Sequence, residues 1–230
     1  MNNLAQIFAI DRLRIETDGR GVRTLVCFCE CPLECEYCLN YNPMIGLRRT
    51  EFISPESLLK RLMIDDIYIK ASFGGVTFGG GEPALQSRFI GEFKRICPPD
   101  WTIYIETSLN VPSEHIQRLA NLIDYWIIDI KDIKNKIYRK YTGKSNKRAI
   151  KNLKYLIKRG LSEKIMVRVP EIPEFNTKED VEKSVCKLNK MGVTSIQRFV
   201  YSTSFQRPKP LIGRPVSPFR GLFSDLFEEI

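Results

Sequence analysis

The sequence predicts an α/β protein built as a partial (β/α)6 barrel of the TIM type. Short runs rich in β-branched and aromatic residues alternate with stretches whose apolar residues return about every 3.6 positions, as parallel strands and crossover helices require. An open doubly wound sheet has the same alternation. Polar, glycine and cysteine motifs follow the ends of several predicted strands, and barrel enzymes assemble their sites at that rim, so the barrel is favoured.

The elements can be justified in chain order. Strands are predicted at 24–29, 76–78, 101–106, 125–130, 165–169 and 195–201. Between them, four sets of apolar residues share one helix face: Leu85, Phe89, Phe93 and Ile96; Ile116, Leu119 and Ile123; Ile150, Leu153 and Ile157; Val181, Val185 and Leu188. Ser54 followed by Pro55 predicts a helix start, because the hydroxyl can cap the helix and proline suits its first turn.

Length and composition indicate one soluble globular domain. The 230 residues are 43% hydrophobic and 27% charged, and no apolar run approaches the ~20 residues of a membrane span. We expect a single domain over 1–230, with a core at about 18–201 and a proline-rich C-terminal extension at 202–230 whose last residues suggest a short amphipathic helix. The start of the chain does not resemble a signal peptide, so a cytoplasmic protein is expected.

The positive charge is concentrated in one segment. The net charge is +9, and residues 131–159 hold twelve basic side chains against the single acid Asp132. A solvated basic face and a surface for docking a macromolecule both explain this segment.

The cysteines indicate a metal site. Five of the seven lie within residues 27–38, and Cys31, Cys35 and Cys38 form the pattern CxxxCxxC. Three thiolates for a four-iron cubane leave one iron for a substrate or cofactor, and S-adenosylmethionine (SAM) is the expected occupant. The alternative is a zinc site completed by Cys27 or Cys29, since the only histidine, His115, is distant in the sequence.

A glycine run follows the second predicted strand. In GVTFGGGEP, Gly79, Gly80 and Gly81 precede Glu82. Glycine lets backbone approach a ligand closely, and exposed N–H and C=O groups suit the carboxylate and ammonium of a zwitterion. A tight turn explains the same glycines.

Taken together, the motifs resemble a known family. CPLECEYC, GGVTFGGGEP, YIETS, the stretch beginning DIKDIK and MVRVPEIPEFN are similar to the radical SAM enzymes, and within them to the glycyl radical enzyme activating enzymes of the pyruvate formate-lyase type. The resemblance covers about 18–191. The chain lacks the inserted ferredoxin-like segment of some members, which implies one 4Fe-4S cluster.

The resemblance implies the reaction and the partners. SAM is cleaved reductively to a 5′-deoxyadenosyl radical, which abstracts hydrogen from a glycine of a partner glycyl radical enzyme. A reductant such as flavodoxin or ferredoxin supplies the electron. The alternatives are a radical SAM enzyme acting on a different peptide or on RNA, for which the basic segment offers a surface, and a non-catalytic metal-binding protein.

The resemblance also assigns roles to residues. Cys31, Cys35 and Cys38 ligate irons, and Lys131, Asp129 and Arg168 form the expected catalytic set. The residues expected to contact SAM are Tyr37, near the adenine, Gly80, Gly81, Glu82, Glu106, Thr107, Asp129, Lys131 and Arg168. Thr107 is also a candidate for a monovalent cation site beside Glu106. Asp18, Gly19, Gly21 and Arg23 match the segment that faces the substrate.

Two features depart from the family pattern. The last predicted strand reads IQRFVYSTSF, without the histidine that reaches the site in the activating enzymes. Cys27 and Cys29 stand where apolar residues and glycine are usual. By their spacing both are expected to face the barrel interior, either as small core residues or as an exchangeable thiol near the cluster.

Overall fold

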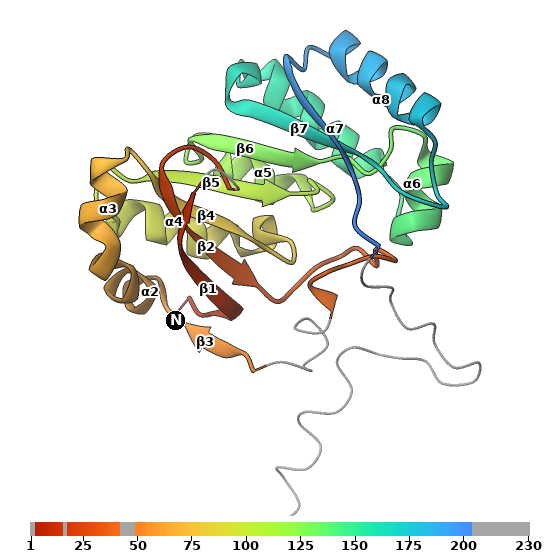
Figure 1. Cartoon of the computed structure of the whole chain (residues 1–230). Helices are drawn as coiled ribbons and strands as arrows, with labels where there is room; N and C mark the ends of the chain where they lie inside the picture. The colour runs from red at the N-terminus through yellow and green to blue at the C-terminus, as the bar shows by residue number, and fades with distance from the viewer. Residues whose placement is uncertain (1–2, 16–17, 42–48, 204–230) are drawn as a thin grey trace, which may run out of the picture.

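A single curved sheet organises the chain. The structure is a computed structural model that describes residues 3–15, 18–41 and 49–203. Its eight-stranded sheet has the order β3-β1-β2-β4-β5-β6-β7-β8 (Figure 1). The strands are β1 Ala5–Ile15, β2 Val22–Phe28, β3 Glu51–Ile53, β4 Gly75–Gly80, β5 Thr102–Thr107, β6 Tyr125–Asp129, β7 Ile165–Glu171 and β8 Ser195–Val200.

The parallel part of the sheet confirms the predicted α/β partial barrel. Strands β2, β4, β5, β6, β7 and β8 pair in parallel, each with the next. They correspond to the six strands expected from the sequence, with ends that differ by a few residues. Each pair is joined by a crossover, so all six C-terminal ends meet at one rim. That rim positions the candidate site.

An antiparallel edge is the part of the sheet that sequence reasoning missed. β1 pairs with β2, for example Ile7 with Phe28, and β3 pairs with β1. The N-terminal half of β1 packs into the core, but its second half is largely exposed and rich in charged residues. Its sequence therefore lacks a sustained alternation, and long-range pairing determines the strand.

The helices bury the faces that periodicity predicted. They are α2 Pro55–Leu62, α3 Asp66–Ala71, α4 Ser87–Ile96, α5 Ser113–Leu119, α6 Asn135–Thr142, α7 Lys147–Lys158 and α8 Lys178–Lys190, with single turns η1 Met63–Asp65, η2 Pro83–Gln86 and η3 Ser162–Lys164. The predicted start at Ser54 is confirmed, since its hydroxyl accepts from Ser57 N at 3.2 Å. Ile96, the last residue of α4, is half-exposed rather than buried.

One apolar cluster joins the sheet to its helices. Helices α4, α5 and α7 lie along one face of the sheet in Figure 1. Side chains on that face are apolar, and Phe78 of β4 meets Phe93 of α4 with ring centroids 5.5 Å apart. Because successive strand residues point to opposite faces, the neighbouring positions face the barrel interior. Those positions carry the polar side chains of the site.

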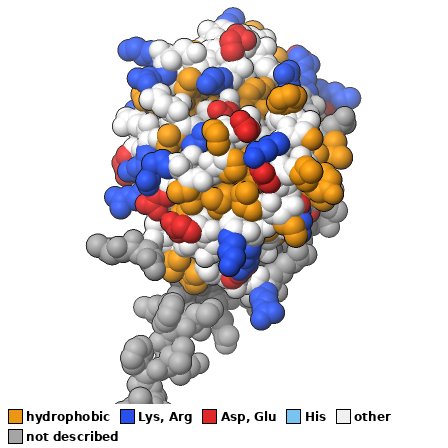
Figure 2. Space-filling view, turned by 90° about the vertical axis from the view of Figure 1, so that its left-hand side faces the viewer, with side chains coloured by type: hydrophobic (Ala, Val, Ile, Leu, Met, Phe, Trp, Pro, Cys, Tyr) orange, Lys and Arg blue, Asp and Glu red, His pale blue; other side chains and the backbone are white. Residues whose placement is uncertain are grey.

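Exposed apolar side chains gather around η1 and α3 on the outer surface. Ile64, Ile67, Tyr68 and Phe73 on and around η1 and α3 are exposed. Figure 2 views the molecule from the side on which α3 lies and shows apolar side chains among charged ones. Within 3–15, 18–41 and 49–203, no helix has the length and apolarity to cross a membrane. Of the expected proline-rich extension at 202–230, residues 204–230 lie outside the described residues.

Candidate functional site

A cavity of about 420 Å³ opens at the C-terminal rim of the parallel strands. It brings together eleven of the residues that the sequence motifs singled out: Cys31, Cys35, Cys38, Gly80, Gly81, Glu82, Glu106, Thr107, Asp129, Lys131 and Arg168. These residues come from five segments that are far apart in the chain. The sequence placed all of them except Arg168 at or just after a strand end, and the sheet topology makes those ends neighbours, while Arg168 lies within β7.

The cysteine loop follows β2 and is tied to two other elements. Glu34 N donates to Thr142 O at 2.9 Å and Glu36 N donates to Tyr141 O at 3.2 Å, so the loop rests on the end of α6. Asn40 Nδ2 donates to Gly80 O at 2.7 Å, joining the loop to β4. Sequence reasoning missed Asn40, although its place two residues after the last cysteine of the triad is a usable signal. The loop is thereby held against the glycine segment.

The burial of the Cys31 and Cys35 thiols is compatible with ligation of iron. Burial raises the pKa of Cys35 to about 12, with the Lys131 ammonium acting in the opposite direction. Burial also raises the pKa of Cys31. Without metal these thiols are protonated at neutral pH, and ligation would release their protons. Among the described residues, no three His, Cys, Asp or Glu side chains surround a single ion position. A cubane instead takes each thiolate on a different iron.

The glycine segment is fixed by sterics at two positions. Gly80 has φ +90°, and a Cβ there would lie 2.8 Å from the Cys27 Cα. A Cβ on Gly81 would lie 2.2 Å from Glu30 O. Both contacts are shorter than packed atoms allow, and Gly80 also needs the left-handed conformation that glycine adopts without strain. Backbone therefore lines this wall of the cavity, as a small zwitterion requires.

Glu82 is buried, and its carboxylate has four protein donors. These are Thr107 Oγ1 at 2.5 Å, Ser108 N at 2.9 Å, Ser108 Oγ at 2.6 Å and Ala84 N at 3.2 Å. Burial raises the pKa of Glu82, while the donors from Ser108 and Thr107 act against that rise. A carboxylate accepts about four hydrogen bonds. Glu82 thus holds the 107–108 turn in place, and Ser108 joins the site as a residue that the motifs did not reveal.

Two ion pairs lie side by side in the cavity. Lys131 Nζ is 2.7 Å from Asp129 Oδ2, and Arg168 Nη1 is 3.0 Å from Glu106 Oε1. Asp129 and Arg168 are register partners on β6 and β7, so the two pairs are neighbours. Burial alone would lower the pKa of Lys131, but Asp129, Tyr201 and Cys35 raise it well above 10.5. Burial raises the pKa of Glu106, and Arg168 opposes this.

One carboxylate oxygen tests whether SAM fits this cavity. Asp129 Oδ1 is buried and has no hydrogen-bond partner in the structure. A buried acceptor without a donor is costly, and a ligand hydroxyl or ammonium would satisfy it. The cavity also carries both signs of charge and exposed backbone at Gly80 and Gly81. These groups match the hydroxyls, ammonium and carboxylate of SAM, so the residues present fit this cofactor.

Aromatic residues at the end of β8 and just after it stand in the segment where the sequence lacks the expected histidine. Phe199 and Tyr201 line the cavity. The Lys131 ammonium lies 4.7 Å from the centre of the Tyr201 ring, within the range of a cation–π contact. Their position at the end of the last parallel strand was the available signal for both residues. This wall is aromatic and carries no imidazole.

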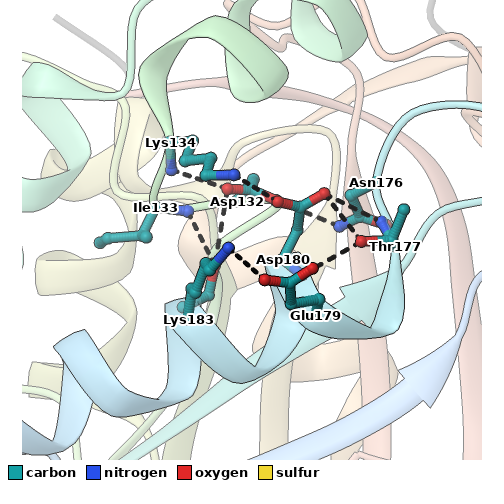
Figure 3. Close-up of polar contacts among 9 residues, drawn as sticks. Asp132, Ile133, Lys134, Asn176, Thr177, Glu179, Asp180 and Lys183 are labelled. Carbon is teal, nitrogen blue, oxygen red and sulfur yellow. Dashed lines mark hydrogen bonds and ion pairs between the residues drawn. The ribbon is translucent and has the colours of Figure 1, made fainter.

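A polar network around Asp132, the residue after Lys131, fixes the loop that follows β6 (Figure 3). The Asp132 carboxylate is buried and accepts from Lys134 N at 2.7 Å and from Asn176 Nδ2 at 3.3 Å. Lys134 forms an ion pair with Asp180 in the first turn of α8. Burial raises the pKa of Asp132, and the hydrogen bond from Lys134 N opposes that shift. The network connects the loop carrying Lys131 to the start of α8.

Five residues expected to lie near a ligand are outside the cavity lining: Asp18, Gly19, Gly21, Arg23 and Tyr37. Tyr37 is buried in a ring cluster, 5.7 Å from the Phe175 centroid and 6.0 Å from that of Tyr141. Asp18 is buried and forms an ion pair with Arg14. Arg23 lies near the N-terminal end of β2, whereas the cysteine loop follows its C-terminal end.

The Arg23 side chain is buried among structural partners. Its guanidinium donates to Thr77 Oγ1 at 2.7 Å, Val76 O at 2.8 Å and Thr102 O at 2.9 Å. It also stacks 3.6 Å from the centre of the Tyr104 ring. Arg23 is 1% exposed, and burial lowers its pKa to about 10. The side chain closes the lower end of the barrel.

Cys27 and Cys29 are buried, and neither lines the cavity. Burial raises the pKa of Cys27 to about 12 and that of Cys29 to about 11. Cys27 packs against the backbone of Gly80, while Cys29 lies just beyond the end of β2. These surroundings support the interpretation of small core residues.

The fold and the cavity together define a partial-barrel protein with a three-cysteine cluster site and groups for a zwitterionic nucleoside cofactor. The family model described as the Radical SAM superfamily matches residues 25–185, and the chain belongs to this superfamily. Its members use a 4Fe-4S cluster and SAM, which are accordingly the cofactors of this chain.

Two relatives and one solved structure illustrate which members of the superfamily the chain is similar to. The chain is 26% identical to pyruvate formate-lyase 2-activating enzyme of Escherichia coli, over 93% of this chain and 82% of that protein. It is 29% identical to (2S)-3-sulfopropanediol dehydratase activating enzyme of Klebsiella oxytoca, over 74% of this chain and 72% of that protein. The structure of Streptococcus suis SuiB bound to S-adenosylmethionine matches with a TM-score of 0.59 at 19% identity. That match covers 79% of this chain and 41% of SuiB, and it shows the shared fold.

Proposed function

We propose that this chain is an activating enzyme that creates a glycyl radical on a partner protein. The relatives that cover most of the chain are named as activating enzymes, including those of pyruvate formate-lyase 2 and of a dehydratase. The observation that carries the proposal is the cavity that gathers the three cysteines and both ion pairs at one rim. This is the arrangement that a cluster and a bound zwitterion need in order to meet.

The residues of the cavity divide the work of holding the cofactors. Cys31, Cys35 and Cys38 hold three irons, and the remaining iron is left for the amino and carboxylate groups of SAM. The backbone of Gly80 and Gly81 lines the place for the methionine part. When bound, the cofactors would supply a 5′-deoxyadenosyl radical, made by one-electron reductive cleavage of the S–C5′ bond with methionine as the other product, for removal of a hydrogen atom from the glycine Cα.

The charged residues orient SAM rather than transfer protons. Asp129 Oδ1 is available for a ribose hydroxyl, and Lys131 remains an ammonium near the cofactor carboxylate. The Arg168–Glu106 pair borders the same space. Thr107 Oγ1 donates to Glu82 and accepts from Leu109 N, which leaves one lone pair for a monovalent cation beside Glu106. Tyr37 acts indirectly, by supporting the cysteine loop through its ring cluster.

The proposal also covers the electron donor, the cellular compartment and the extent of the catalytic domain. The electron donor is a reductant such as flavodoxin or ferredoxin, because cleavage of SAM needs one electron from outside the chain. A reducing, cytoplasmic compartment is supported by Cys97 and Cys186, which are free thiols away from the cysteine loop. The span 18–201 acts as one catalytic domain, in line with the single main apolar cluster among its described residues.

Anaerobic reconstitution with iron and sulfide tests the proposal. After addition of dithionite and SAM, the loaded protein should form 5′-deoxyadenosine. The variant Cys35→Ser should lose the charge-transfer absorption of the cluster and the product, while the matched variant Cys97→Ser, outside the cavity, should retain both. A loaded cluster that yields no 5′-deoxyadenosine would contradict the proposed function.

A further inference from the structure

We propose that a lysine-lined groove between α7 and α8 docks an acidic, amphipathic helical segment of a protein partner. The groove has a volume of about 710 Å³ and lies on the outer, helical side of the barrel, apart from the cofactor cavity. Its lysines are Lys147, Lys151, Lys154, Lys187 and Lys190. This docking role gives a function to exposed lysines of the basic segment 131–159, which take no part in the proposed radical chemistry.

The charge of the groove is uncompensated. All five lysines are exposed, and none of their ammonium groups has a hydrogen bond or ion pair with any described residue. Neighbouring lysines behave differently, since Lys134 pairs with Asp180 and Lys183 with Glu179. No acidic side chain lines the groove. Five like charges around one hollow repel each other and favour an anionic occupant.

The floor of the groove is apolar. Ile133, Ile150 and Met191 line it, and each is partly buried against the main apolar cluster. An amphipathic helix laid in the groove would place apolar side chains on this floor and carboxylates against lysines of α7 on one side and of α8 on the other. The lysines and the apolar floor therefore suit the same ligand, an acidic amphipathic helix.

Nucleic acid fits the lining less well. Single-stranded RNA is held by aromatic side chains on which bases stack, and arginine is favoured for phosphate. Neither an aromatic ring nor an arginine lines the groove. The floor of isoleucine and methionine offers nothing to a sugar–phosphate backbone. The observations therefore favour a protein segment.

The groove shares a loop with the cofactor cavity. Ile133 of the groove is two residues after Lys131 of the cavity. Asn146 Nδ2 donates to Ile133 O at 2.9 Å and to Asp132 O at 3.2 Å, which fixes this loop to the start of α7. A segment docked here would hold its protein beside the rim of the barrel. That last step, in which the docked protein is the one presenting its glycine, rests on the proposed function.

Fluorescence anisotropy with the cluster-loaded full chain tests the groove. The probe is a labelled synthetic helical peptide of about 14 residues, with leucines on one face flanked by glutamates on both sides. We expect it to bind at least about tenfold more tightly than a scrambled peptide of the same composition. The triple variant Lys151→Glu, Lys154→Glu, Lys187→Glu should weaken binding roughly tenfold or more.

A matched variant separates the groove from overall charge. Lys136→Glu, Lys164→Glu, Lys178→Glu changes the net charge equally at exposed lysines outside the groove and should bind the probe nearly as the unaltered chain does. Equal loss in both variants, or equal binding of the scrambled peptide, would overturn the proposal, as would tighter binding of oligouridine RNA to the same lysines. Formation of 5′-deoxyadenosine by the groove variant is measured in parallel. It should be unchanged, so a failure of the groove and a failure of the radical chemistry are told apart.

Discussion

At the residue scale, the sequence motifs identify the groups of the cavity better than they identify what each group does. The three cysteines and the four charged residues of the ion pairs were named from motifs, because motifs depend on local sequence. Glu82 was expected to meet the cofactor, but its carboxylate is filled by protein donors that lie some twenty-five residues away in the chain. Partners of that kind are set by tertiary structure and cannot be read from a motif.

The buried partners of Arg23 likewise could not be read from its motif, and they give a test of its structural role. Replacing Arg23 with methionine should lower the free energy of unfolding by about 3 kcal/mol, because buried acceptors such as Val76 O and Thr102 O lose their donor. Urea unfolding of the apoprotein measures this change. The exposed Arg20→Met variant is the control and should change the free energy by less than about 0.5 kcal/mol. A stable Arg23→Met variant would refute the structural role.

Asp129 gives a test of cofactor binding. The change Asp129→Asn keeps the shape of the side chain but removes the charge that faces Lys131 and weakens the acceptor at Oδ1. SAM should bind roughly tenfold more weakly, because a charge-assisted hydrogen bond is replaced by a neutral one. Equilibrium dialysis with the cluster-loaded variant measures the affinity, and Glu163→Gln on the exposed surface is the control. Unchanged affinity would remove Asp129 from the SAM site.

At the element scale, the parallel strands and the crossover helices α4, α5, α7 and α8 were predictable because each carries its own periodic signal. The antiparallel β1 and β3 were not, since an edge strand with an exposed half has no local pattern and owes its form to pairing with β2. Helix α6 was also missed. Its first two positions are polar and basic, and its buried residues are the tyrosines Tyr138 and Tyr141 and Thr142, whose packing under the cysteine loop is long-range.

The Asp132 network, which joins the β6–α6 loop to α8, predicts a pH dependence. Burial raises the pKa of Asp132 in the folded protein, so the folded state binds this proton more tightly than the unfolded state does. The stabilisation from that proton is complete below the ordinary aspartate pKa of about 4 and is lost as the pH rises through the folded pKa. The free energy of unfolding should therefore fall over that interval.

Comparison with Asp132→Asn isolates this effect. The variant should be less stable overall, because an amide cannot accept at both oxygens from Lys134 N and Asn176 Nδ2. Its free energy of unfolding, measured by urea unfolding of the apoprotein from about pH 4 upward, should lack the Asp132 component of the fall. Parallel pH profiles for the two proteins would show that Asp132 titrates normally.

At the scale of the whole molecule, two surfaces with different chemistry share one loop. The cavity at the rim combines thiols, backbone and paired charges, whereas the groove between α7 and α8 combines unpaired lysines with an apolar floor. The excess of positive charge in residues 131–159 was visible in the sequence. Its division between Lys131, which is buried and paired with Asp129 in the cavity, and the exposed lysines of the groove was not, because that depends on which face of each helix meets the barrel.

Deuterium transfer tests the central claim most directly. The cluster-loaded chain is mixed with SAM, dithionite and a glycyl radical enzyme encoded by a neighbouring gene and produced with α-deuterated glycine. The account predicts 5′-deoxyadenosine that carries deuterium, together with the electron paramagnetic resonance signal of a glycyl radical on the partner. Unlabelled 5′-deoxyadenosine and no glycyl radical, from a chain with an intact cluster, would contradict it.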